Sequence, residues 1–215
     1  MIARPSGRFI TLEGGEGAGK STQVALLAKH LRVRGIGVVE TREPGGSPGA
    51  EKIRDILVDG PTDRWDPVTE TLLHFSARRE HVVGTIRPAL ARGAWVLCDR
   101  FADSTRAYQG YGLGVDQALI DRLYRDTVGD LAPDLTLILD IPVEAGLRRA
   151  DARRAGGTRY ERMAVDFHRR LRDGFLEIAR KEPRRCVVID AAGTVDAVAE
   201  AIQTAVDGRL IHATR

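Results

Sequence analysis

One segment of eight residues restricts the fold of this chain more than any other. Residues 14–21 read Gly-Gly-Glu-Gly-Ala-Gly-Lys-Ser and match the spacing G-x-x-x-x-G-K-[ST]. The segment follows an apolar run at residues 9–12 and precedes a helical pattern that starts at Lys20. Glycines allow backbone N–H groups to surround a phosphate, and the N-terminus of the following helix adds partial positive charge. The sequence therefore predicts a loop that binds the phosphates of a nucleotide.

Short apolar runs alternate with longer helical patterns along the chain. The runs, rich in β-branched residues, are at residues 9–12, 38–41, 95–98, 135–139 and 186–189. The helical patterns lie at residues 20–34, 67–92, 115–129, 143–181 with an interruption, and 195–207. Nearly continuous hydrophobicity is typical of strands buried on both faces of a parallel sheet, and repeated strand–helix units form right-handed crossovers. We predict an α/β fold of the P-loop NTPase class, a five-stranded parallel sheet flanked by helices on both faces, with ligands at the carboxyl ends of the strands.

Composition limits the number of domains and the partners. A chain of 215 residues with 43% hydrophobic content suits one domain, residues 1–215. The excess of 33 basic over 30 acidic residues is too small to predict a nucleic-acid groove. No apolar run approaches the ~20 residues of a membrane span, and no signal-peptide pattern follows the first eight residues. We expect a cytoplasmic protein in which Cys98 and Cys186 are buried, reduced thiols.

Asp99 is the candidate metal-binding carboxylate. It ends the apolar run at residues 95–98, and in P-loop enzymes such a residue joins the loop hydroxyl, here Ser21, in holding Mg²⁺. Asp140 and Asp190 also end apolar runs, but only Asp99 is followed by an arginine, Arg100. The alternative is that Asp99 caps the next helix.

Residues 148–162 form the one break in composition. Arginines surround the pair Gly156–Gly157, which interrupts the helical pattern. Like charges on such a segment repel one another until an anion binds. We predict an arginine-rich lid at about residues 148–162.

Five motifs in the same order resemble those of thymidylate kinases from about residue 9 to residue 207. They are Glu13-Gly14-Gly15-Glu16-Gly17-Ala18-Gly19-Lys20-Ser21-Thr22, Thr41-Arg42-Glu43-Pro44-Gly45-Gly46, Asp99-Arg100-Phe101, Ser104-Thr105 with Ala107-Tyr108-Gln109-Gly110, and Pro133-Asp134-Leu135-Thr136-Leu137. The resemblance implies transfer of the γ-phosphoryl group of ATP to dTMP with Mg²⁺, so the expected partners are these two small-molecule substrates, with no nucleic acid and no membrane. It also implies a homodimer packed through helices away from the lid. It also implies that Pro44 follows a cis peptide bond.

The same resemblance implies a role for each matching residue. The phosphates of ATP would contact Gly14, Gly15, Glu16, Gly17, Ala18, Gly19, Lys20, Ser21 and Thr22. The acceptor dTMP would contact Glu16, Arg42, Phe75, Arg79, Arg100, Ser104, Thr105, Tyr108 and Gln109. Catalysis would depend on Lys20, Arg100, Arg153 and Arg159.

Three of these assignments carry open alternatives. Phe75 would stack on thymine by resemblance, although the pattern alone favours a core residue. Arg79 would donate to a thymine carbonyl, with its neighbour Arg78 as the competitor. Some family members carry a basic residue in the phosphate loop where this chain has Gly17, so the catalytic arginines here are expected in the lid, at Arg159 and at Arg153 or its neighbour Arg154.

Two other functions compete with this prediction. A different nucleoside monophosphate kinase, acting on dCMP, UMP or GMP, would have the same loop and lid. A nucleotide-binding regulatory switch is the alternative outside enzymes, but a GTPase would need an Asn-Lys-x-Asp motif, which the sequence does not contain.

Overall fold

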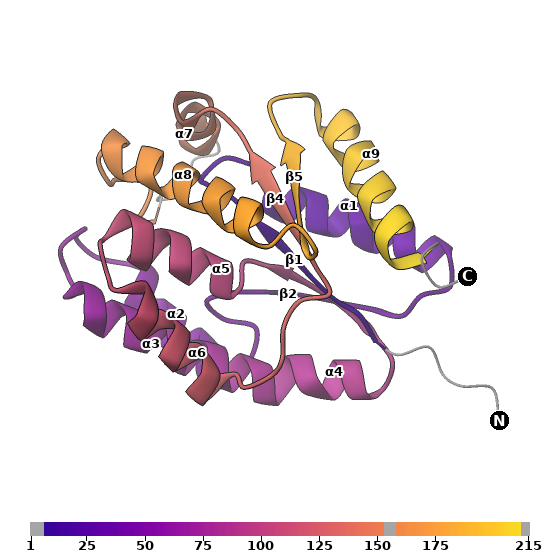
Figure 1. Cartoon of the computed structure of the whole chain (residues 1–215), viewed down its shortest axis with the longest axis horizontal. Coiled ribbons are helices and arrows are strands. Elements are labelled where there is room, and N and C mark those ends of the chain that lie inside the picture. Colours follow the sequence, from indigo (N-terminus) through magenta and orange to yellow (C-terminus); the bar gives the residue numbers. More distant parts are fainter. Residues whose placement is uncertain (1–6, 153–157, 212–215) are drawn as a thin grey trace.

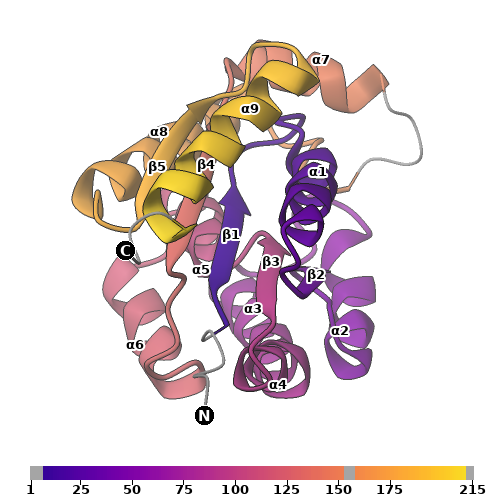
Figure 2. The ribbon, with the colours of Figure 1, turned by 90° about the vertical axis from the view of Figure 1, so that its right-hand side faces the viewer.

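The computed structural model describes residues 7–152 and 158–211 and contains the predicted parallel sheet. Its five strands lie in the order β2-β3-β1-β4-β5, and every pairing between neighbours is parallel. Figure 1 shows the sheet between its helices, and Figure 2 labels all five strands. Each strand is one residue longer than its predicted apolar run. The strands are β1 (Phe9–Glu13), β2 (Val38–Arg42), β3 (Trp95–Asp99), β4 (Leu135–Asp140) and β5 (Cys186–Asp190).

Helices connect the strands. They are α1 (Lys20–Val33), α2 (Pro48–Val58), α3 (Pro67–His81), α4 (Arg87–Ala91), α5 (Ala102–Thr105), α6 (Gln117–Thr127), α7 (Val143–Ala152), α8 (Val165–Lys181) and α9 (Val195–Val206), with π-helical segments η1 (Val82–Ile86), η2 (Arg106–Gly112) and η3 (Asp207–Ile211). Helix α2 was not predicted from the sequence patterns. It has Pro48 in its first turn and is capped by Ser47, whose side chain accepts from the N–H of Ala50.

The helices form a layer on each face of the sheet. α1 and α9 lie side by side on one face, where Leu27 of α1 and Ile202 of α9 pack against Ile10 and Leu137 (Figures 1 and 2). The other face is covered by α4 with η1 and by α8 with η2. Because both faces are covered, the strands are buried on both sides, which explains their continuous hydrophobicity.

The carboxyl ends of the three adjacent strands β2, β3 and β1 meet at one edge. Asp99 is in register with Leu12 on one side and with Arg42 on the other. β1 then leads from Glu13 into the predicted phosphate loop. Three predicted site segments, far apart in sequence, therefore lie together. Within the described residues, no helix is long and apolar enough to cross a membrane.

Candidate active site

A cavity of about 620 Å³ opens at this edge of the sheet. Its walls come from the phosphate loop, the ends of β2 and β3, α3, η2 and the segment 158–162. A cavity of this size can hold a small ligand such as a nucleotide.

Lys20 lies at the bottom of the phosphate loop. Its Nζ donates to the carbonyl oxygens of Gly14 (3.0 Å) and Gly15 (2.8 Å). Burial, together with the positive charge of Arg100, lowers the pKa of Lys20 to about 8. Of the predicted loop residues, Glu16, Gly17, Gly19, Lys20 and Ser21 line the cavity, whereas the side chain of Thr22 is exposed on the first turn of α1.

Ser21 and Asp99 provide adjacent oxygen atoms beside the loop. The Ser21 hydroxyl donates to Oδ2 of Asp99 at 2.5 Å, and both residues line the cavity. Asp99 does not cap the next helix, because α5 begins after Phe101 without a side-chain cap. A hydroxyl and a carboxylate are the hard oxygen donors that suit Mg²⁺.

Arg100 occupies an unusual backbone conformation next to Asp99. Its φ of 72° lies in the left-handed region, which is uncommon for a residue with a side chain. The guanidinium donates to the carbonyl oxygen of Gly14 (3.0 Å) and to Glu16 (3.0 Å). A guanidinium group that is held by two protein acceptors in this way is well placed to bind an anion in the cavity.

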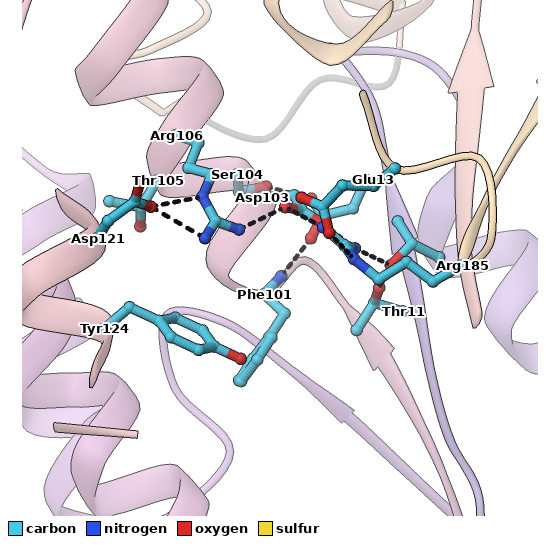
Figure 3. Close-up of polar contacts among 12 residues, drawn as sticks. Thr11, Glu13, Phe101, Asp103, Ser104, Thr105, Arg106, Asp121, Tyr124 and Arg185 are labelled. Atoms are coloured by element: carbon cyan, nitrogen blue, oxygen red, sulfur yellow. Dashed lines mark hydrogen bonds and ion pairs between the residues drawn. The ribbon is translucent and has the colours of Figure 1, made fainter. Parts of the chain in front are cut away.

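The buried carboxylate of Glu13 holds the turn that contains Arg100. It accepts from the backbone N–H of Phe101 (2.7 Å) and from the hydroxyl of Ser104 (2.6 Å) (Figure 3). Burial and the nearby charge of Asp103 raise the pKa of Glu13 to about 7. Figure 3 also shows that Asp103 pairs with Arg185 and Arg106 behind this turn. Ser104, predicted to contact the substrate, lines the cavity, and its hydroxyl also stabilises the turn of Arg100 through Glu13.

Glu16 presents a carboxylate to the cavity. Its Oε1 accepts from the hydroxyl of Tyr108 (2.7 Å) as well as from Arg100. Burial alone would raise the pKa of Glu16, but the charges of Arg100 and Lys20 outweigh that effect and lower the pKa. Glu16 is therefore ionised near pH 7.

Three arginines form the cationic side of the cavity. Arg42, at the end of β2, pairs with Glu51 (3.0 Å), and Arg54 donates to the carbonyl oxygen of Pro44 (2.7 Å). With Arg100 they provide three guanidinium groups, which match phosphate oxygens well. Arg54 was not among the predicted site residues, because it lies on helix α2, which the sequence patterns did not predict. The expected cis bond before Pro44 is present.

The structure corrects the assignment of Arg79. Arg78, not Arg79, lines the cavity, where it donates to Glu43 (2.8 Å) and to the Thr105 hydroxyl (3.0 Å). Arg79 is exposed and donates to the carbonyl oxygen of Thr127. Consecutive helical residues differ by about 100° in direction, so only one of the two can face the cavity.

Phe75 also points away from the cavity, because of the same helical geometry. Phe75 is only 1% exposed, packs with Val115 and Ile120, and is not part of the cavity wall. The aromatic ring that lines the cavity one turn before Arg78 belongs to His74. Burial, assisted by the charges of Arg78 and Arg159, lowers the pKa of His74 to about 3, so its imidazole is neutral. The sequence held no signal for this choice, because the pairs His74–Arg78 and Phe75–Arg79 have the same i, i+4 spacing.

Arg159 is the one expected lid arginine in the described part of the chain, and its guanidinium does not contact the phosphate loop. Arg153 and Arg154 lie outside the described residues. Arg159 is 1% exposed and absent from the cavity wall, and its guanidinium donates to Leu57, Thr62 and Glu70. Its predicted place beside the γ-phosphate is therefore wrong for this conformation, because all three of its nitrogens are engaged with protein acceptors.

Gly17 occupies the loop position at which some family members carry a basic residue, and the structure leaves no room there for a side chain. Its φ is 69°, and a Cβ atom built on it would lie 1.8 Å from the carbonyl oxygen of Gly146 in α7. Only glycine fits at this position while α7 packs against the loop.

The fold and the site together define a P-loop kinase. A glycine loop followed by lysine and serine lies beside a strand-end aspartate, and arginines line an adjacent acceptor cavity. This places the chain among ATP-dependent nucleoside monophosphate kinases.

Comparison with known proteins identifies the family. The family model of thymidylate kinase matches residues 12–202. The chain is 60% identical to the thymidylate kinase of Caulobacter vibrioides over 95% of this chain and 98% of that protein. It is 54% identical to the thymidylate kinase of a Bradyrhizobium strain, over 96% and 92%. The crystal structure of thymidylate kinase from Ehrlichia chaffeensis matches with a TM-score of 0.78 and 38% identity, over 94% of this chain and all of that chain. The chain belongs to the thymidylate kinase family, and the predicted fold and activity are confirmed.

Proposed function

We propose that the cavity binds dTMP with its base against His74 and Arg78 and its phosphate between the arginines and the glycine loop. This orientation of dTMP is inferred from the Nη1 atom of Arg78. Among the described residues it is a buried donor without a hydrogen-bond partner, although the side chain is only 2% exposed. A buried unpaired donor is costly unless a ligand supplies the acceptor. A carbonyl oxygen of thymine is an acceptor of this kind.

The phosphate end of dTMP suits the opposite side of the cavity. Arg42, Arg54 and Arg100 supply three guanidinium groups, and Glu16 with Tyr108 lines the region between phosphate and base. The ring of Tyr108 would leave no room for a 2′-hydroxyl. A 5′-phosphate is already largely ionised near pH 7, so transfer needs no general base. The task of the protein is alignment and cancellation of charge.

The donor ATP binds at the glycine loop. Lys20 would exchange its two carbonyl acceptors for phosphate oxygens, and Ser21 with Asp99 would hold Mg²⁺. When bound, the metal neutralises charge on the phosphates. A nearby anion raises the pKa of an ammonium group, so bound phosphate would keep Lys20 positively charged to a higher pH than in the free enzyme.

The proposed working form is a homodimer. Three apolar side chains, Val68, Leu72 and Val83, are 41–49% exposed and follow one face of α3 and η1. Ile56 of the neighbouring helix α2 is 38% exposed. A second copy of the chain packed on this face would bury an apolar surface that is otherwise in water. We place the enzyme in the cytoplasm, where ATP and nucleoside monophosphates are available.

A coupled ADP-release assay tests the acceptor. Purified enzyme, ATP and Mg²⁺ are combined with dTMP, dUMP, dCMP, UMP or GMP in separate reactions. We expect the highest kcat/KM with dTMP and little activity with dCMP, because a cytosine amino group would face the Arg78 donor instead of a carbonyl oxygen. A higher kcat/KM with any of the other acceptors would contradict the proposed base pocket.

A further inference from the structure

We propose that the buried pair Glu70–Arg159 is a positioning pair. It joins the segment 158–162 to the wall of the base pocket and sets the orientation of Gln109 and Tyr160. This inference rests on the proposed function of the cavity as the dTMP site. The side chains of Glu70 and Arg159 are both 1% exposed, so neither residue contacts a substrate in the cavity directly.

Arg159 joins three parts of the chain. Its Nε donates to the carbonyl oxygen of Leu57 (2.8 Å), and its Nη1 donates to that of Thr62 (3.0 Å). Its backbone N–H donates to the carbonyl oxygen of Val58 (3.1 Å). Its Nη2 pairs with Glu70 near the start of α3. Arg159 therefore fixes the segment 158–162 to the end of α2 and to α3.

Glu70 connects Arg159 to two side chains of the cavity wall. Its Oε1 accepts from Nε2 of Gln109 (2.8 Å) and from the hydroxyl of Tyr160 (2.8 Å). Burial raises the pKa of Tyr160 well above its usual value, so this hydroxyl keeps its proton and is the donor. Gln109 and Tyr160 both line the cavity, whereas Glu70 and Arg159 do not.

The charge of Glu70 fixes which group Gln109 presents to the ligand. An ionised carboxylate accepts hydrogen bonds and cannot donate them, so the amide nitrogen of Gln109 must face Glu70. The carbonyl oxygen of the same amide is then left as an acceptor for the cavity. A thymine ring offers N3–H as a donor, whereas cytosine has an acceptor at that position.

His74 completes the connection. Its Nε2 lies 2.9 Å from the hydroxyl of Tyr160. Since that hydroxyl donates to Glu70, it accepts from His74, and the Nε2–H tautomer of the imidazole is selected. Three side chains of the base pocket thus depend on one carboxylate, and that carboxylate depends on Arg159 for its countercharge.

Removal of Arg159 tests the pair. Arg159→Met leaves the Glu70 charge buried without its partner, which is strongly destabilising for a buried ion pair. We expect the KM for dTMP to rise about tenfold and the KM for ATP to stay within about twofold, since the pocket for the base loosens and the glycine loop does not. The kcat/KM preference for dTMP over dCMP should fall at the same time.

Matched variants separate positioning from general damage. Arg180→Met removes an arginine of the exposed Glu177–Arg180 pair on α8 and should leave every constant unchanged. Glu70→Gln placed on Arg159→Met removes the uncompensated buried charge, so this double variant should recover melting temperature but not dTMP affinity, because a neutral amide no longer fixes the orientation of Gln109. Arg159→Lys keeps the charge without the fork and should lie between wild type and Arg159→Met.

Tyr160→Phe decides the question if Arg159→Met does not fold. It deletes only the hydroxyl that links Glu70 to His74, and should raise the KM for dTMP by about threefold or more with the melting temperature little changed. A fall in kcat with an unchanged KM for dTMP would place Arg159 at the transition state and overturn the proposal, as would equal effects of Arg159→Met and Arg180→Met. An unchanged KM in Tyr160→Phe would overturn it too. Failure of wild-type enzyme to phosphorylate dTMP would instead reject the proposed function.

Discussion

Arg78 and Arg79 are consecutive in α3, but their guanidinium groups serve different parts of the molecule. Arg78 is buried beside the cavity and donates to Glu43, to Thr105 and to the carbonyl oxygen of Phe101. Arg79 is exposed and reaches the carbonyl oxygen of Thr127, at the end of α6. The two positions therefore form a natural pair for mutagenesis, with identical chemistry and different surroundings.

Arg78→Met should impair use of dTMP far more than Arg79→Met. Loss of Arg78 removes the free donor at the base and leaves Glu43 without one of its partners. We expect kcat/KM for dTMP to fall by at least about 100-fold and base selectivity to weaken, because charged hydrogen bonds are worth about 1.5–3 kcal/mol and a buried unpaired charge adds to the loss. Arg79→Met should stay within about threefold of wild type. Steady-state kinetics with dTMP and dCMP checks both, and a larger loss in Arg79→Met would restore the original assignment.

Binding of ATP should be coupled to protonation of Lys20. In the free enzyme the pKa of Lys20 is lowered to about 8, and an anion next to the ammonium raises it. Around pH 8 to 9 the free enzyme has partly lost this proton and the complex has not, so binding takes up protons and weakens as pH rises further. At pH 6.5 the lysine is charged in both states and the uptake disappears.

Calorimetry in buffers of different ionisation enthalpy measures this uptake. Lys20→Met should abolish the uptake near pH 8.5 and lower turnover by about 100-fold or more, as for other preorganised charged groups at a transferring phosphoryl group. Equal proton uptake by wild type and Lys20→Met would assign the linkage to another group.

Tyr108 should have two separable effects. Tyr108→Phe keeps the ring but removes the hydrogen bond to Glu16, so kcat/KM for dTMP should fall by roughly 3- to 15-fold with the preference for deoxyribose intact. Tyr108→Ala also removes the ring, and the ribonucleotide of the same base should then become a better substrate relative to dTMP. Comparison of the two sugar forms in the ADP-release assay provides the test, and loss of sugar preference in Tyr108→Phe would contradict it.

Glu13 should make the folded enzyme less stable as pH rises. Its folded pKa of about 7 is above the usual value of 4.5, so the contribution of the protonated form is fully present below pH 4.5 and is lost as pH rises through 7. The difference of about 2.5 units corresponds to at most about 3 kcal/mol. Residue 13 cannot ionise in Glu13→Gln. The free energy of unfolding of this variant, compared with that of wild type at the same pH, should therefore rise between pH 4.5 and pH 8. Urea unfolding at several pH values measures this, and parallel pH profiles for the two proteins would assign the effect elsewhere.

The exposed face of α3 should hold the proposed dimer together. Leu72→Glu puts a charge in the middle of the apolar face formed with Val68 and Val83, and should convert the enzyme to a monomer in light scattering. Glu200→Leu changes an exposed residue of α9, far from this face in sequence, and should leave the mass unchanged. A monomeric wild type at micromolar concentration would reject the dimer.

The sequence alone determined the strands and the position of the glycine loop. The five apolar runs were continuous because both faces of each strand are buried, and that pattern is a local property of the chain. The spacing of residues 14–21 likewise gave the loop, since the wrapping of a phosphate by consecutive N–H groups depends on neighbouring residues only. Asp99 was predicted beside Ser21 because it ends an apolar run and is followed by Arg100, which distinguishes it from Asp140 and Asp190.

Only the tertiary structure decided which side chains face the acceptor. His74 or Phe75, and Arg78 or Arg79, are equally spaced pairs on one helix, and a rotation of about 100° exchanges one pair for the other. What fixes that rotation is the packing of Phe75 on Val115 and Ile120, residues about 40 positions away. The role of Arg159 was hidden for the same reason. A run of arginines in the sequence does not reveal that one of them turns inward to a buried carboxylate, because its partner Glu70 lies 89 residues earlier and meets it only in the folded chain.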